Sequence, residues 1–336
     1  MENMPLCSVV MSVYNGEVYL KEAIDSILQQ SYDNFEFIII DDASSDGSLE
    51  IILSYKDSRI VLIQNEKNLF LAASLNKGIR IAKGKYIVRM DADDISMKDR
   101  LLKQVSFMES NPQVGISGTC SEIIGHGSGF GNYSQDDQTI KFKLLHECHL
   151  LHPTLILRKE LIFENNLFYN EEYRKNQDYE LFVRAIDITE FANLPDRLIK
   201  YRQTEDNVKR EVHNQKENVL ILQKKLFHKI GIEVTDHKLH LYKLINKQEY
   251  PQSKEFLIES CEFLQLLVYS NNEKRFFTTE KFEAYINNLF ENVCRNVKGT
   301  GLIPFKFYLK SNISHFGYYK VKLLVILFLK GILVNK

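Results

Sequence analysis

The stretch Tyr86-Ile-Val-Arg-Met90-Asp91-Ala92-Asp93-Asp94 decides how this chain is interpreted. Its first half is a short apolar strand, and three carboxylates then follow within four residues. Like charges at the end of a buried strand repel one another, and each needs solvent or a partner. A divalent cation removes that cost, because a hard metal takes oxygen ligands held at rigid backbone positions. The stretch therefore predicts a metal site at the end of a strand.

A second pair of acids, Asp41-Asp42, follows the apolar run Phe37–Ile40. Apolar strands and amphipathic helices alternate around both acidic clusters. The strands are expected at residues 7–13, 35–40, 59–64 and 86–90. This alternation predicts an α/β protein with a doubly wound, mostly parallel sheet. Ligands of such sheets bind beyond the carboxyl ends of the strands, so we expect Ser12 and the two acidic clusters to converge there.

Length and composition indicate one large domain and a smaller one. The chain has 336 residues, of which 44% are hydrophobic and 26% charged, as in soluble globular proteins. We expect an α/β domain over residues 1–210 and a mainly helical region over residues 211–336. The helical region is predicted because Gly and Pro become rare from about residue 211 onward. Residues 117–140 are rich in Gly and Ser. They lack the strand–loop–helix frame of a phosphate-binding loop and are expected to form a surface loop.

Charge is unevenly distributed along the chain. The net charge is −1, yet eight Lys or Arg and no acid follow Glu291, so this tail carries about +8 and the rest about −9. Basic and aromatic residues together suit a lipid headgroup surface, and we expect peripheral membrane contact there. The alternative is a tail that packs on the protein itself with its lysines solvated. The acidic body does not suggest a nucleic-acid partner.

Other features predict a cytoplasmic protein at the inner face of the cell membrane. The five cysteines are scattered and suggest no disulfide framework. The first residues show no secretory signal, and the longest apolar run, Leu323–Leu329, is too short to span a membrane.

An ordered set of motifs over about residues 5–205 resembles the family 2 glycosyltransferases with the GT-A fold. The motifs are Ser8-Val-Val-Met-Ser-Val-Tyr-Asn15, Asp41-Asp-Ala-Ser-Ser-Asp-Gly-Ser48, Asn68-Leu-Phe-Leu-Ala-Ala-Ser-Leu-Asn-Lys-Gly78, Met90-Asp-Ala-Asp-Asp94, His152-Pro-Thr154, Gln177-Asp-Tyr-Glu-Leu181 and Tyr201-Arg202. The resemblance implies inverting transfer of a sugar from a nucleotide-diphosphate sugar, most simply a UDP-sugar, to an acceptor hydroxyl. The acceptor is expected to be a surface glycan or a lipid-linked glycan.

The resemblance also assigns roles to four residues of the nucleotide pocket. Ser12 and Tyr14 correspond to residues that hold the nucleotide after the first strand. Asp42 corresponds to the acid that accepts a hydrogen bond from the base, and Asp41 is expected to shape that pocket. From the residues alone, Asp41 and Asp42 could instead form an Asx-turn.

Asp91 and Asp93 correspond to the family's Asp-x-Asp pair, and Asp178 to its catalytic base. The resemblance implies that Asp93 binds Mg²⁺ or Mn²⁺ directly and that Asp91 contacts ribose or the metal. Asp94 is expected to cap the next helix. Such a cation would stabilise the departing diphosphate, and a base of this kind contributes about 10²–10⁴-fold to the rate. Many relatives have Glu in place of Gln177. Because Gln177 carries no negative charge, we expect a smaller upward shift in the pKa of Asp178 than such relatives would show.

Several alternatives remain at the level of the sequence. A sugar-phosphate nucleotidyltransferase also places acids at the ends of a parallel sheet, and a non-catalytic protein could keep the fold and bind nucleotide-sugars. Processive synthases of the family carry a Gln-x-x-Arg-Trp motif, whereas this chain has no Trp, so we expect one sugar per binding event. His146, His149 and His152 suggest zinc, but their spacing fits no standard finger. We expect His152 to line the acceptor side instead.

Overall fold

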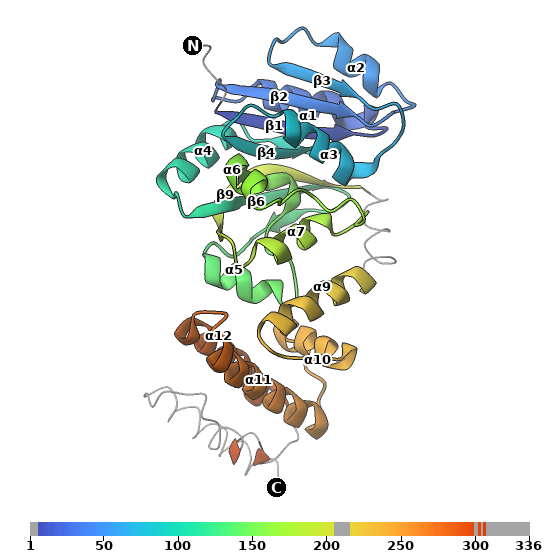
Figure 1. The fold of residues 1–336 in the computed structure, drawn as a ribbon. Coiled ribbons are helices and arrows are strands. Elements are labelled where there is room, and N and C mark those ends of the chain that lie inside the picture. The colour runs from blue at the N-terminus through green and yellow to red at the C-terminus, as the bar shows by residue number, and fades with distance from the viewer. Residues whose placement is uncertain (1–5, 205–215, 299–301, 304, 307–336) are drawn as a thin grey trace. The chain divides into compact units, whose positions relative to one another are not determined.

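The computed structural model describes residues 6–204 and 216–298, together with residues 302, 303, 305 and 306 (Figure 1). The chain divides into two compact units. The first comprises residues 1–141 and 148–219, and the second comprises residues 142–147 and 220–336. The expected domain boundary after residue 210 stays a prediction, because residues 205–215 lie outside the described part. Residues 307–336, which hold most of the basic tail, lie outside it as well.

The first unit is built on a sheet whose described strands follow the order β3-β2-β1-β4-β8-β6-β9-β5, with β7 paired to β6. The strands are β1 (Cys7–Val13), β2 (Phe35–Asp41), β3 (Ile60–Gln64), β4 (Tyr86–Asp91), β5 (Ile95–Ser96), β6 (Val114–Gly125), β7 (Gly129–Gly131), β8 (Ile156–Arg158) and β9 (Glu190–Gln203). The four strands β3, β2, β1 and β4 are parallel, as predicted. β8 then runs antiparallel to both β4 and β6, while β6 and β9 are parallel.

Helices connect and cover these strands. They are α1 (Glu17–Leu28), α2 (Ser48–Ser54), α3 (Phe70–Ile81), α4 (Arg100–Ser110), α5 (Asp137–Leu144), α6 (Lys159–Glu164) and α7 (Gln177–Ala185), with a 3₁₀ turn at His152–Thr154. The strands β1 and β2 are apolar and buried on both faces, as parallel strands between helices must be. Leu20, Ala23, Ile24 and Ile27 form the buried stripe of α1 and join the core on one face.

On the opposite face α3 packs closely through Gly78. A Cβ atom added at Gly78 would lie 2.7 Å from Val10 Cγ1 and 2.9 Å from Ile40 Cδ1. These distances are shorter than real carbon contacts, so only glycine lets the helix lie this close to β1 and β2. The helix begins beside the carboxyl end of β2, where the backbone N–H of Leu69 donates to Asp42 Oδ1.

The sheet curls so that its far edge returns to the carboxyl end of β4. β5 is the last strand in the order of the sheet, yet only three residues separate it from β4 in the chain. Its register partners on β9 are Lys200 for Ile95 and Ile199 for Ser96, in an antiparallel pair. The turn that carries the acidic cluster is therefore held by β4 on one side and by the β5–β9 pair on the other.

The prediction of a surface loop over residues 117–140 is wrong for its first part. β6 occupies residues up to Gly125, and its side chains are buried as far as Ser121. Small residues that commonly form loops let neighbouring strands approach here. A Cβ atom at Gly118, for example, would lie 2.4 Å from Asn193 Oδ1 on β9.

The second unit is helical, as expected for the C-terminal region. Its helices among the described residues are α9 (Lys216–Lys229), α10 (Asp236–Lys247), α11 (Lys254–Lys274) and α12 (Thr279–Asn296). An aromatic cluster forms part of its core, where Phe142 stacks edge-on against Phe277 and Phe282 at centroid distances of 5.1 and 5.3 Å. Among the residues described, no helix combines the length and the apolar character needed to cross a membrane.

Candidate functional site

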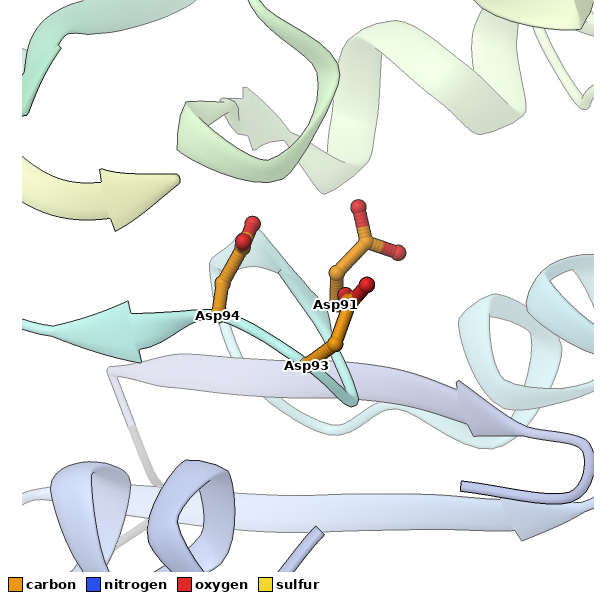
Figure 2. Close-up of side chains that lie close together, drawn as sticks. All are labelled: Asp91, Asp93 and Asp94. Atoms are coloured by element: carbon orange, nitrogen blue, oxygen red, sulfur yellow. The ribbon is translucent and has the colours of Figure 1, made fainter. Parts of the chain in front are cut away.

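Asp91, Asp93 and Asp94 gather at the turn between β4 and β5 (Figure 2). Each side chain offers a carboxylate oxygen, and these three atoms all lie within 4.8 Å of one another. Among the described residues, this is the one group of three or more His, Cys, Asp or Glu side chains arranged in this way. The turn thus brings Asp94 together with Asp91 and Asp93, the two acids predicted to bind the metal.

Asp94 does not cap a helix, so this prediction is wrong. α4 begins only at Arg100, with Asp99 at its N-cap position, because β5 intervenes after the turn. Asp94 is fully buried. Its Oδ1 accepts a hydrogen bond of 2.8 Å from the backbone N–H of Arg202, and its Oδ2 has no hydrogen-bond partner. Asp94 is therefore shielded from the solvent that normally surrounds the side chain of an N-cap residue.

The surroundings of Asp93 and Asp94 favour the protonated forms of these two acids when no cation is bound. Burial, and to a lesser extent the negative charge of Asp91, raise the pKa of Asp93 to about 6. Burial also raises the pKa of Asp94 well above its ordinary value, and its two acidic neighbours act in the same direction. The buried guanidinium of Arg89 forms an ion pair with Asp91 and offsets part of this repulsion.

Arg202 holds the turn from the opposite strand. Its Nε donates to the backbone carbonyl of Asp93 at 2.8 Å, and its Nη2 bonds to Glu22 Oε2 at 2.6 Å. Its guanidinium also lies 4.3 Å from the centre of the Tyr19 ring. The sequence places Arg202 in the Tyr201-Arg202 motif, but its role of anchoring the acidic turn depends on the curl of the sheet.

The residues expected at the nucleotide lie at the carboxyl ends of β1 and β2. In the sheet, Ser12 is the register partner of Asp91, and Val13 is the partner of Asp41. Asp41 is buried, and its Oδ1 accepts a hydrogen bond of 3.3 Å from the backbone N–H of Ser44, so it shapes the loop after β2. Tyr14, in contrast, is 53% exposed. The convergence predicted from the strand ends is confirmed for these positions.

Asp42 is buried and bonded to the loop that precedes α3. Its Oδ1 accepts hydrogen bonds from Asn65 Nδ2 at 2.7 Å and from the backbone N–H of Leu69 at 2.8 Å. Asn65 in turn accepts a bond of 2.7 Å from Lys77 Nζ and donates one of 2.9 Å to Ser74 Oγ. Sequence analysis missed Asn65, although it follows β3 directly, and the rule that selected Asp41-Asp42 applies to it as well.

Asp178 lies in the first turn of α7 and is half-buried. Burial raises its pKa above the ordinary value, the negative charge of Asp91 acts in the same direction, and the positive charge of Arg89 opposes them. These influences show that Asp178 lies in the same electrostatic neighbourhood as the acidic turn. The uncharged Gln177 beside it does not prevent the upward shift, because burial has the largest effect.

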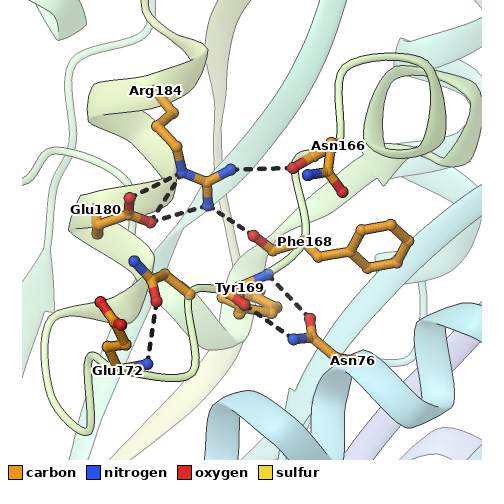
Figure 3. Close-up of polar contacts among 8 residues, drawn as sticks. Asn76, Asn166, Phe168, Tyr169, Glu172, Glu180 and Arg184 are labelled. Carbon is orange, nitrogen blue, oxygen red and sulfur yellow. Dashed lines mark hydrogen bonds and ion pairs between the residues drawn. The ribbon is translucent and has the colours of Figure 1, made fainter.

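An ion pair and hydrogen bonds to backbone carbonyls anchor residues 166–176, the segment that leads into α7 (Figure 3). Arg184 bonds to the carboxylate of Glu180, with Nε–Oε1 and Nη2–Oε2 distances of 2.8 Å each. The same guanidinium donates to the backbone carbonyls of Asn166 at 3.3 Å and Phe168 at 2.6 Å. These bonds fix the start of the segment relative to the helix that carries Asp178.

His152 and Tyr169 form a buried polar pair near the acids. His152 Nε2 lies 2.8 Å from the Tyr169 hydroxyl. Burial lowers the pKa of His152 well below its ordinary value, so the imidazole is neutral at physiological pH. His152 does not join a zinc site with His146 and His149. His146 stacks edge-on against Tyr242, whereas His149 Nδ1 lies 3.3 Å from Ser134 Oγ.

Comparisons with known proteins agree with this geometry. The sequence model described as Glycosyl transferase family 2 matches residues 8–184. An uncharacterised glycosyltransferase of Haemophilus influenzae is 34% identical over 231 residues, which are 65% of this chain and 71% of that protein.

Two further proteins illustrate the range of relatives. The Escherichia coli UDP-Glc:alpha-D-GlcNAc-diphosphoundecaprenol beta-1,3-glucosyltransferase WfgD is 35% identical over 143 residues, 43% of this chain and 56% of that protein. The crystal structure of S. aureus TarS 1–349 in complex with UDP-GlcNAc covers 96% of this chain and 89% of that chain, with a TM-score of 0.58 and 16% identity. The likeness to TarS shows the shared fold, which is of the GT-A type. On the extent of the family match, this chain belongs to glycosyl transferase family 2.

Proposed function

We propose that this protein is a metal-dependent, inverting glycosyltransferase that moves one sugar from a nucleotide-diphosphate sugar to an acceptor hydroxyl. One observation carries the proposal. Three carboxylates converge within 4.8 Å at the carboxyl edge of a parallel sheet, and Asp178, from a distant part of the chain, lies under the electrostatic influence of one of them, Asp91. This arrangement supports one group of acids for the leaving diphosphate and a separate carboxylate for the acceptor.

The residues of the acidic turn fit Mg²⁺ or Mn²⁺. Asp94 Oδ2 is a buried oxygen without a hydrogen-bond partner, and a cation would supply one. The pKa of Asp93 is raised to about 6, and a bound cation would favour the ionised form of this carboxyl group. Asp93 would bind the ion, with Asp91 contacting the ion or the ribose. When bound, the cation supplies Lewis-acid stabilisation for the negative charge of the leaving diphosphate.

The nucleotide is proposed to lie along the ends of β1 and β2, against Ser12, Tyr14, Asp41 and Asp42. Asp42 would accept a hydrogen bond from the base. A UDP-sugar is the favoured donor, since WfgD is named for UDP-Glc. The same name specifies a diphosphoundecaprenol-linked acceptor, which supports a lipid-linked glycan as the acceptor here and a place for the enzyme at the cytoplasmic face of a membrane.

Asp178 is proposed to remove the proton from the acceptor hydroxyl as the oxygen attacks the sugar. A base on the side opposite the leaving diphosphate gives inversion in a single displacement. The raised pKa of Asp178 suits this role, because a more basic carboxylate is a better proton acceptor provided that it remains ionised at the working pH. We propose one sugar per binding event.

The test uses the full chain with UDP-Glc, Mn²⁺ and a diphosphoundecaprenol-linked GlcNAc as probes, and it measures released UDP. We expect Asp178→Asn to lower turnover by about 10²–10⁴-fold and to leave the affinity for UDP and Mn²⁺, measured by titration calorimetry, nearly unchanged. Asp187→Asn, which alters an exposed acid beyond the same helix, is the matched control and should retain turnover.

Three outcomes would contradict the proposal. Full activity of Asp178→Asn would show that Asp178 is not the base. Equal UDP affinity in Mn²⁺ and in a chelator would show that nucleotide binding does not depend on the metal. Release of pyrophosphate from UTP and a sugar phosphate would indicate a nucleotidyltransferase instead.

A further inference from the structure

Phe70 has a backbone conformation that its side chain disfavours. Its φ is 68°, in the left-handed region, which a bulky residue rarely adopts and glycine adopts freely. Two local bonds accompany this conformation: the N–H of Phe70 donates to Asn68 Oδ1 at 2.8 Å, and the preceding N–H of Leu69 donates to Asp42 Oδ1 at 2.8 Å. A phenylalanine here keeps a strain that glycine would remove, which points to a role for the ring itself.

The ring does not contribute to the hydrophobic core. It is 44% exposed, and the guanidinium of Arg174 lies over it at 3.9 Å from the centroid. Arg174 is itself exposed and belongs to the segment that leads into α7, four residues before Asp178. The contact therefore joins the beginning of α3 to the segment just before Asp178, the proposed catalytic base.

α3 holds the same segment at a second place, through Asn76 (Figure 3). Asn76 Nδ2 donates to the backbone carbonyl of Tyr169, and Asn76 Oδ1 accepts from the backbone N–H of Tyr169, both at 2.9 Å. Asn76 is buried, so these two bonds are shielded from competition by water. One helix thus holds residues 169–174 at both ends, firmly at Tyr169 and through an exposed ring contact at Arg174.

The exposed end of α3 is also the end bonded to the nucleotide pocket. Leu69 donates to Asp42, and Phe70 is the next residue. A nucleotide that bonds to Asp42 would therefore act directly on the backbone that positions the Phe70 ring. The buried Asn76 contact would serve as the fixed point of this arrangement.

We infer that Phe70 and Arg174 are a pair of positioning residues that couples occupation of the nucleotide pocket at Asp42 to the order of residues 170–176, and through them to the placement of Asp178. This inference rests on the proposed function. Neither residue contacts the reacting atoms in this role.

The test is amide hydrogen exchange of the full chain with and without UDP and Mn²⁺. In the wild-type protein we expect slower exchange on binding both in residues 65–72 and in residues 170–176. In Phe70→Leu and in Arg174→Gln, residues 65–72 should still slow, whereas the response of residues 170–176 should shrink by about two- to fivefold, the range expected for an exposed cation–π contact. Phe70→Tyr, which keeps a ring, should respond like the wild type.

Phe130→Leu is the matched control. Phe130 is 60% exposed, and Arg197 lies 4.1 Å from its ring centre, so the variant removes a comparable exposed pair elsewhere in the first unit. Its residues 170–176 should respond as in the wild type. An undiminished response in Phe70→Leu overturns the inference. So does a tenfold loss of UDP affinity in that variant, because Phe70 would then be a nucleotide contact.

The inference and the proposed function fail in different ways. If the wild type binds UDP with Mn²⁺ but residues 170–176 do not respond, the coupling is wrong and the proposed function stands. If the wild type binds no UDP, the proposed UDP donor is wrong and the coupling to UDP falls with it. The ring contact is then tested alone: Arg174→Gln should speed exchange of residues 170–176 about two- to fivefold in the unliganded protein, and no change would show that the pair orders nothing.

Discussion

Asp94 has one carboxylate oxygen bonded to the chain and the other without a partner. Because burial raises its pKa in the folded state, the ionised form lowers the stability of the folded protein. The stabilising effect of protonation is fully present below the unfolded pKa of about 3.9 and is lost as the pH rises through the folded value. Asp93, with a pKa raised to about 6, acts in the same sense.

We therefore predict that Asp94→Asn stabilises the metal-free protein at neutral pH. The amide oxygen can still accept from Arg202, while the buried charge is gone. A gain of about 1 kcal/mol corresponds to a Tm increase of about 2–4 °C for a unit of this size. Calorimetry in the presence of EDTA should show the increase at pH 7.5 and little difference at pH 4, where Asp94 is protonated in the folded wild type.

Asp99→Asn provides the comparison for this prediction, because it alters an exposed acid at the start of α4. Its Tm should change little at either pH. An Asp94→Asn protein that is less stable than the wild type at pH 7.5 would show that the acid is compensated in the absence of metal.

At the scale of secondary structure, the sequence predicts the four apolar strands of the parallel part of the sheet and misses the strands of the remaining part. β1, β2 and β4 are nearly continuous apolar runs, so their ends and the acids after them follow from the pattern. β6 is rich in Gly, Ser and Thr and resembles a loop, and β5 has only two residues. The pairing of β5 with β9 depends on contacts about a hundred residues apart, which no local pattern encodes.

The candidate site follows the same division. Asp41, Asp42, Asp91 and Asp93 were predictable because they end apolar strands, and Asn65 could have been found by the same rule. Arg202 anchors the acidic turn only because the sheet curls. The positive φ of Phe70 could not be anticipated from an aromatic residue, since this residue type disfavours it.

The packing of α3 gives a prediction at this scale. In an exposed helix, Gly→Ala stabilises by up to about 1 kcal/mol. At Gly78 the new methyl group would collide with Val10 and Ile40, and we expect Gly78→Ala to lower the free energy of unfolding by about 1–3 kcal/mol. Urea denaturation measures the change, and a stabilised Gly78→Ala protein would show that α3 can move away from the sheet without cost.

At the scale of the whole molecule, the proposed site and the C-terminal helices belong to different units. Each acid of the proposed site lies in the first unit, while Phe282 is fully buried in the aromatic cluster of the second. We predict that Phe282→Leu lowers the thermal stability of the protein and leaves the affinity for UDP and Mn²⁺ unchanged within about twofold. Truncation of a buried aromatic side chain typically costs about 1–5 kcal/mol, depending on how much of it is lost.

Calorimetry and titration of the same preparation separate these two effects. A clear loss of UDP affinity in Phe282→Leu, at a temperature where the protein is folded, would show that the second unit contributes to nucleotide binding.

The hydrogen bond between Asp94 and Arg202 joins residues 108 positions apart in the chain, and this separation affects folding during synthesis on the ribosome. A chain synthesised from its N-terminus can pair β1 to β4 early, but the acidic turn lacks its anchor until residue 202 has left the exit tunnel. At about 5–20 residues per second, the nascent chain spends several seconds with its carboxylates unrestrained. The acidic turn is therefore among the last parts of the first unit to mature, well after the sheet around it has begun to fold.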